Sequence, residues 1–168
     1  GICHLAVGLR ANSQLTHLEL QHCGFDQGAV THLVDIIVYK FSALTFLNLQ
    51  GNYLRNEGIM NFFHMLPLSK SLKQLSVADN RWNEDDQVLD KLCSVFLTNT
   101  GIEKYDVRYN QVEEKGGNRF LETLKEATHI TGFEISENMS PELFKDLLAV
   151  TTRKKKKGKK GKKKKKSQ

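Results

Sequence analysis

A segment of eleven residues recurs five times in this chain, and no other feature constrains the fold as strongly. The copies fit the pattern LxxLxLxxN/CxL, with the last copy degrading at its end, and successive copies begin 29, 28, 30 and 28 residues apart. A period of this length indicates one structural unit stacked repeatedly along the chain, because a single unit of this size cannot bury its own apolar face. The copies are LTHLELQHCGF from Leu15, LTFLNLQGNYL from Leu44, LKQLSVADNRW from Leu72, IEKYDVRYNQV from Ile102 and ITGFEISENMS from Ile130.

The first half of each copy alternates apolar and polar residues, as a short half-buried strand does. This alternation places Leu18 and Leu20, and their equivalents Leu47, Leu49, Leu75 and Val77, in the core. A bulky apolar residue follows each of the first four strands, so Trp82 is predicted to be a core residue rather than a binding-site aromatic. Between strand and bulky residue lies a column whose side chains are expected to hydrogen-bond the backbone of neighbouring units: Cys23, Asn52, Asn80, Asn110 and Asn138.

Each strand is followed by a stretch with helical periodicity, such as Val30, Leu33, Val34 and Ile37 after Gly28. In the last copy, Ser140-Pro141-Glu142 predicts a helix start, and the helix is expected to end near Val150. Strands and helices that alternate in this way predict an α/β solenoid. We expect a horseshoe with parallel strands on its concave face and helices on its convex face.

The long period and the mixture of Cys and Asn in the column resemble the ribonuclease-inhibitor-like class of leucine-rich repeats. The resemblance covers residues 1–150 as one domain of about five repeats, and it implies a fold rather than one particular function. Gly1 occupies the repeat position of Gly28 and Gly58, and Ile2 begins a helical pattern before the first strand. We therefore expect that the chain starts within a repeat and that further repeats or a packed neighbour precede it.

The net charge of +6 combines two regions of opposite sign. The segment from Arg153 onward holds 12 of the 25 basic residues and none of the 19 acidic ones, so the body before it carries a net charge of −6. Residues 151–168 offer almost no apolar surface and are predicted to be a disordered, Lys-rich tail. The candidates for polyanion binding are Arg153, Lys154, Lys155, Lys156, Lys157, Lys159, Lys160, Lys162, Lys163, Lys164, Lys165 and Lys166.

Several polyanions suit this tail, namely nucleic acid, anionic lipid and the acidic tails of proteins. The tail has no aromatic residue to stack on bases and no amphipathic pattern for a membrane surface. These absences favour acidic protein tails, although nucleic acid, a nuclear-import signal and a purely solubilising role remain open alternatives.

The polar positions of the strands are expected to line the concave face, which is acidic at both ends. Phe46 and Tyr109 are its aromatic anchors. A merely solvated sheet surface is the alternative interpretation. The candidates for protein binding on this face are Glu19, Gln21, Phe46, Asn48, Gln50, Asp106, Arg108, Tyr109 and Glu134.

Signatures of catalysis and of metal binding are missing from the sequence. There is no GxSxG motif, no P-loop and no GxGxxG, and the three cysteines and six histidines are scattered without metal-ligand spacing. The acidic run Glu84-Asp85-Asp86 precedes a predicted helix, so it is expected to serve the helix N-terminus rather than a metal. We therefore expect a non-enzymatic protein with no metal and no cofactor.

Two functional hypotheses remain. The fourth copy, YDVRYNQVEEKGG, resembles the repeats of axonemal leucine-rich-repeat proteins of the nexin–dynein regulatory complex type. That resemblance implies a structural subunit of a microtubule-associated complex in the cytoplasm and cytoskeleton, in the cilium axoneme, whose Lys-rich tail meets acidic tubulin tails. The alternative is a soluble regulator or sensor that holds a protein partner in its concave face, in the manner of GTPase-activating or innate-immune proteins. The activating proteins for Ran end in an acidic region, which disfavours that particular role here.

Overall fold

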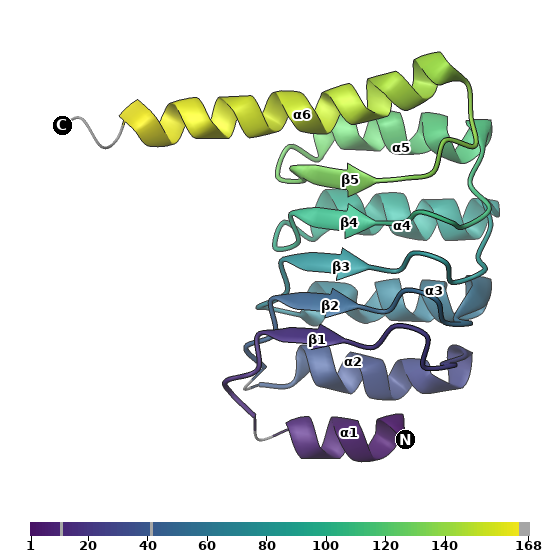
Figure 1. The fold of residues 1–168 in the computed structure, drawn as a ribbon, viewed down its shortest axis with the longest axis vertical. Coiled ribbons are helices and arrows are strands. Elements are labelled where there is room, and N and C mark those ends of the chain that lie inside the picture. Colours follow the sequence, from purple (N-terminus) through teal and green to yellow (C-terminus); the bar gives the residue numbers. More distant parts are fainter. Residues whose placement is uncertain (11, 41, 165–168) are drawn as a thin grey trace.

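Strands and helices alternate along the whole chain (Figure 1). The computed structural model describes residues 1–10, 12–40 and 42–164, with side chains as far as residue 152. The elements are, in order, α1 (Ile2–Leu9), β1 (His17–Glu19), η1 (Gln27–Ala29), α2 (Val30–Val38), β2 (Phe46–Asn48), α3 (Arg55–Met65), η2 (Leu66–Leu68), β3 (Gln74–Ser76), α4 (Asp86–Thr98), β4 (Lys104–Asp106), α5 (Glu114–Glu126), β5 (Gly132–Glu134) and α6 (Pro141–Lys164).

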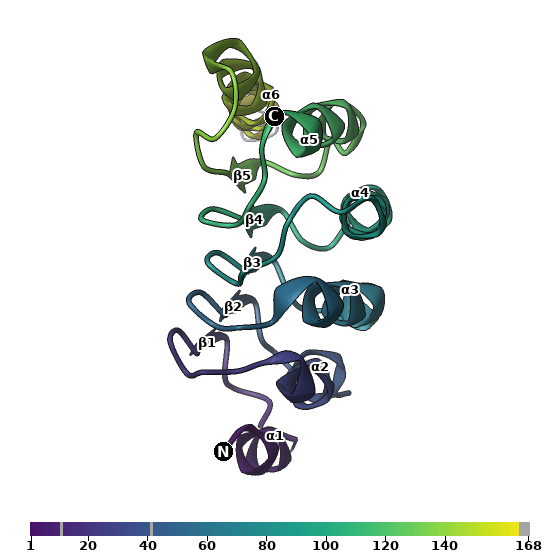
Figure 2. The same ribbon diagram turned by 90° about the vertical axis from the view of Figure 1, so that its right-hand side faces the viewer.

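The strands of the described residues form one parallel sheet in the order β1-β2-β3-β4-β5. Leu18 pairs with Leu47 and Leu47 with Leu75, and the same row continues through Tyr105 and Phe133. The strands therefore pair in the same register in which the five sequence copies align. The sheet lies on one side of the stack and α1 to α5 lie on the other (Figure 2). The predicted α/β alternation with a parallel sheet is therefore confirmed.

The core lies between the sheet and the helices. Leu47, Leu49 and Trp82 are fully buried there, so the prediction for Trp82 is confirmed. Leu18 and Leu20 pack against this core, as predicted, but they are only partly buried. The reason is that β1 is the edge strand of the described sheet and has a paired neighbour on one side only.

The asparagine column binds the backbone of adjacent repeats, as predicted. The Asn52 side chain donates to Leu20 O at 2.9 Å and to Leu49 O at 2.7 Å, and it accepts from Cys23 N at 3.1 Å and Phe25 N at 3.0 Å. Asn80 and Asn110 also bind the backbone of both their own and the preceding repeat. Cys23 and Asn138, at the two ends of the column, are exposed.

The acidic run before α4 serves helix N-termini, as expected. Asp85 accepts a hydrogen bond from Gln87 N at 2.9 Å and caps α4. Glu84 reaches the next repeat, where its carboxylate accepts from Glu113 N at 2.9 Å and Gly116 N at 2.8 Å at the start of α5. A carboxylate at a helix N-terminus satisfies orphan amides and complements the helix dipole. These contacts therefore fix the spacing between consecutive helices.

Helix α6 packs against both α5 and β5 and covers that end of the stack (Figures 1 and 2). It runs to Lys164, past the end near Val150 that the sequence predicts, so its last turns fall within the segment expected to be disordered. Lysine is a good helix former, and propagation of an existing helix costs far less than nucleation. No helix of the described residues is long and apolar enough to span a membrane. The domain boundary at residue 150 stays a prediction.

One polar atom is buried in the aromatic part of the core. The Tyr105 ring lies 4.7 Å from the Phe96 ring and 6.3 Å from the Phe63 ring, measured between centroids. Its hydroxyl has no hydrogen-bond partner among the described residues, and burial raises its pKa. An unpaired buried hydroxyl is destabilising, because water has been removed without replacement.

Tyr105→Phe is accordingly expected to raise the free energy of unfolding by about 1 kcal/mol. Chemical denaturation of the full chain measures this change. Tyr109→Phe is the matched control, because Tyr109 is 62% exposed and loses a solvated hydroxyl. A Tyr105→Phe variant that is less stable than the wild type would show that the hydroxyl has a partner.

Candidate functional site

The face of the sheet that points away from the helices, here called the open face, carries the candidate protein-binding residues. Glu19 and Gln21 lie on it at the β1 edge and contact each other, with Gln21 Nε2 donating to Glu19 Oε2 at 3.1 Å. They line neither of the two hollows on this face. The first hollow has a volume of about 480 Å³, and the candidates that line it are Phe46, Asn48, Gln50, Asp106, Arg108 and Glu134.

Arg108 joins two of the carboxylates on the open face. Its Nε and Nη2 donate to the two oxygens of Asp106 at 2.9 and 2.8 Å, and Nη2 lies 3.0 Å from Glu134 Oε2. The hydrogen bond to Asp106 is the main cause of the raised pKa of Arg108. A bidentate pair of this kind fixes the plane of the guanidinium. The positive charge of Arg108 is therefore already matched by carboxylates of the chain itself.

Tyr109 is held in a backbone conformation that bulky residues avoid. Its φ is +59°, and its side chain is 62% exposed. Its backbone N–H donates to Ser136 Oγ at 2.7 Å, which ties this turn to the next repeat. His22, Gly51 and Asp79 occupy the equivalent position in other repeats and also have positive φ, so this conformation is a feature of the repeat that glycine and aspartate tolerate better than tyrosine does. A tyrosine there stores roughly 1–2 kcal/mol of strain, and such strain is found most often at functional sites.

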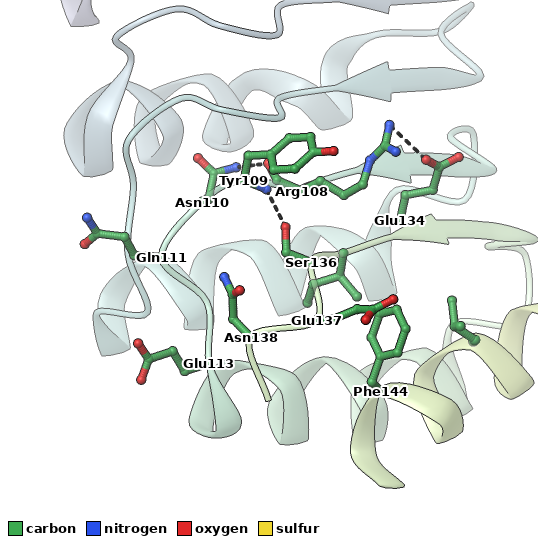
Figure 3. Close-up of a pocket in the computed structure, with 12 residues that line it drawn as sticks. Arg108, Tyr109, Asn110, Gln111, Glu113, Glu134, Ser136, Glu137, Asn138 and Phe144 are labelled. Carbon is green, nitrogen blue, oxygen red and sulfur yellow. Dashed lines mark hydrogen bonds and ion pairs between the residues drawn. The ribbon is translucent and has the colours of Figure 1, made fainter. Parts of the chain in front are cut away.

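Tyr109 opens onto the second hollow, here called the α6 groove, which has a volume of about 800 Å³ (Figure 3). One wall comes from the turns after β4 and β5, and the other comes from the first turns of α6. Phe144 and Leu148 supply the apolar surface of the α6 wall, and Leu148 is 42% exposed. The carboxylates of Glu113, Glu134 and Glu137 are at the rim. The groove thus offers apolar anchors within an acidic surround.

The α6 wall was missed by the sequence analysis, which treated this helix as a closing element. Leu143 and Leu147 are buried against the stack, four residues apart. Phe144 and Leu148 form a second stripe with the same spacing, one residue further on. An apolar face wider than one stripe indicates that a helix contacts a second surface in addition to the one it packs against.

The described residues offer little for catalysis or metal binding. Within residues 1–10, 12–40 and 42–152, no group of three or more His, Cys, Asp or Glu side chains is placed to hold a metal ion. Burial raises the pKa of the Cys93 thiol, whereas an activated thiol needs a lowered pKa. The side chains of the polyanion-binding candidates, from Arg153 to Lys166, lie outside the described residues, so that assignment stays a prediction.

No protein-family model matches this sequence. Solved structures with the same fold exist despite very low sequence identity. The chain is similar to a structure described as leiomodin-1 actin-binding site 2, with a TM-score of 0.79, 11% identity, and 98% of this chain and 96% of that chain covered. It is also similar to the tropomodulin C-terminal domain of Caenorhabditis elegans, with a TM-score of 0.75, 13% identity, and 96% and 97% of the two chains covered. The chain therefore has the leucine-rich-repeat-like α/β fold of these domains along nearly its whole length.

Proposed function

We propose that this chain is a non-catalytic protein-interaction module of a cytoskeletal assembly, and that its partner docks in the α6 groove. The observation that carries the proposal is the meeting of two exposed apolar side chains from separate elements, Tyr109 and Leu148, in one hollow. Exposed aromatic and aliphatic residues that converge in a groove are typical anchors of protein interfaces.

The chemistry of the groove favours a basic partner segment. Glu113 and Glu137 are exposed, and Arg108 is already paired with Asp106 and Glu134. A lysine or arginine beside an apolar side chain would meet a carboxylate at the rim while the apolar group entered the groove. Complementary charge of this kind raises the association rate and selects the partner.

Two polymers suit such a cytoskeletal role. The resemblance of the fourth repeat to axonemal proteins supports a subunit of a microtubule-associated complex in the cilium. Filamentous actin is the second polymer to test, since one protein that shares the fold is described as an actin-binding site. Because one fold hosts many functions, a binding experiment has to distinguish between microtubules and filamentous actin.

Co-sedimentation with each polymer tests the proposal. The full chain should pellet with one of them at about 0.3 M salt, where attraction between the Lys-rich tail and acidic surfaces is screened. Leu148→Gln or Tyr109→Asn should then weaken binding about tenfold or more, because each removes an apolar anchor. Tyr109→Asn should also raise the free energy of unfolding by about 0.5–1 kcal/mol, since asparagine tolerates positive φ.

Leu97→Gln is the matched control. Leu97 lies on α4 and is 41% exposed, close to the 42% of Leu148 on α6. This variant should bind like the wild type. If neither polymer pellets the chain, the cytoskeletal role is wrong, and a soluble regulator that holds another protein becomes the better hypothesis. If all three variants bind equally, the partner docks elsewhere.

A further inference from the structure

A third hollow lies apart from the α6 groove, among the turns that follow β1, β2 and β3. Its volume is about 420 Å³. The residues that line it belong to three consecutive repeats, and two of them are arginines: Gly24, Asp26, Gln27, Tyr53, Arg55 and Arg81. No position of the repeat pattern marks these arginines, because they occupy different places in their repeats.

Arg55 and Arg81 differ from the other arginines whose side chains the structure describes. Arg10 pairs with Asp35 at 3.4 Å, Arg108 with Asp106 at 2.8 Å, and Arg119 with Asp90. Within the described part of the chain, neither arginine of the hollow forms an ion pair or a side-chain hydrogen bond. Two like charges therefore share one hollow with a single carboxylate, that of Asp26, in a body whose net charge is negative.

Tyr53 orients one of the two guanidinium groups. The Cζ atom of Arg81 lies 4.2 Å from the centroid of the Tyr53 ring. A guanidinium that lies over an aromatic ring in this way still has N–H groups with which to donate to an acceptor. A planar fork held in this way matches the two oxygens of a carboxylate or phosphoryl group.

The single carboxylate in the lining does not cancel this charge. Asp26 accepts a hydrogen bond from Gly28 N at 2.9 Å and serves as the N-cap of η1. Arg55 is the first residue of α3, whose N-terminus adds partial positive charge. The hollow therefore carries a net positive charge, and the backbone engages its one acidic group.

Both arginines are held with positive φ, +56° at Arg55 and +59° at Arg81. Gly24, which occupies the repeat position of Arg81, has φ +71° and meets this demand without a side chain. We propose that the hollow binds an oxyanion, a carboxylate or phosphoryl group presented by a protein partner, between the guanidinium groups of Arg55 and Arg81. This site is separate from the α6 groove and takes the opposite charge.

Titration of the full chain with sodium phosphate, and separately with sodium acetate, at constant ionic strength tests the proposal. The NMR signals of the arginine Nε–Hε groups report each site directly, and the Lys-rich tail contributes none of them beyond Arg153. Saturable shifts are expected at Arg55 and Arg81, with a Kd of the order of 1–10 mM for phosphate. The stronger of the two anions identifies whether a phosphoryl group or a carboxylate is the preferred ligand.

Arg81→Gly and Arg55→Gln should each weaken the response of the remaining arginine about tenfold. Arg81→Gly keeps the positive φ without strain, and Arg55→Gln provides a second test if one variant folds poorly. Arg10→Gln removes an exposed, paired arginine and should change nothing. Tyr109→Asn should also leave the response intact, which separates this site from the groove. Shifts that stay linear with anion concentration, or that persist in both variants, would overturn the proposal.

Discussion

Asn80→Ala is expected to lower the free energy of unfolding by about 2–3 kcal/mol. Asn80 is fully buried, and its Nδ2 donates to Leu49 O and to Ala78 O, both at 2.9 Å. Its backbone N–H donates to the side chain of Asn110, and Asn52 and Asn80 both donate to Leu49 O, so Asn52, Asn80 and Asn110 form one hydrogen-bonded ladder. Alanine would remove both donors from a site that water does not reach, and it would leave a cavity.

Thermal unfolding measures this effect, and the loss corresponds to a fall in Tm of roughly 5–10 °C for a domain of this size. Asn138→Ala is the matched control, because Asn138 occupies the same column in the last repeat but is exposed. The control should stay within about 0.5 kcal/mol of the wild type. Equal melting of the two variants would mean that the ladder does not stabilise the stack.

The strands, their register and the asparagine ladder were predictable because each follows from a period. Alternation within the strand decides which side chain faces the core, and a slip of one residue would turn every leucine outward. The amide of Asn52 offers two N–H donors and an acceptor oxygen to the two turns that it joins. These local requirements repeat in every unit, so five copies reinforce one interpretation.

The α6 groove was predicted only in part. Tyr109 and Arg108 were identified from their place after β4, but Phe144 and Leu148 were not. Their contribution depends on the path of α6 across the end of the stack, where it packs against α5 and β5, and the repeat pattern does not give this path. The positive φ of Tyr109 could not be predicted either. The repeat pattern does not give the backbone conformation at this position, where Gly51 stands in the second copy and tyrosine in the fourth.

The hollow of Arg55 and Arg81 shows a further limit of reasoning from periodic patterns. These arginines lie 26 residues apart, slightly less than one repeat, and the turns after β2 and β3 bring them to one hollow. The absence of carboxylate partners depends on side-chain placement in three dimensions. The net charge does not indicate a positively charged hollow, because the body as a whole is acidic.

The second large effect is expected for the salt dependence of binding through the Lys-rich tail. If its 12 positive charges engage an acidic polymer, a complex with 6–10 charge contacts should weaken by about 10³–10⁵ between 50 and 200 mM salt, because each contact releases condensed counterions. Replacing Lys162 to Lys166 with glutamine removes five of these charges and should make the logarithmic salt slope shallower by up to about 4. Microtubule co-sedimentation across a salt series measures both values.

Two comparisons decide what the tail recognises. Removal of the acidic tails of tubulin should abolish most of the salt-dependent binding if those tails are the partner, whereas binding through the α6 groove at high salt should persist. Duplex DNA is the rival polyanion and is added as a competitor in the same assay. The glutamine variant should melt at the wild-type temperature, because the replaced residues lie beyond Thr151, the last buried residue of α6 that the structure describes. The tail is attracted to either polymer by charge and not by sequence, so the two have to be compared directly. Unchanged binding to tail-less microtubules, or much tighter binding to DNA, would show that the partner of the tail is not tubulin.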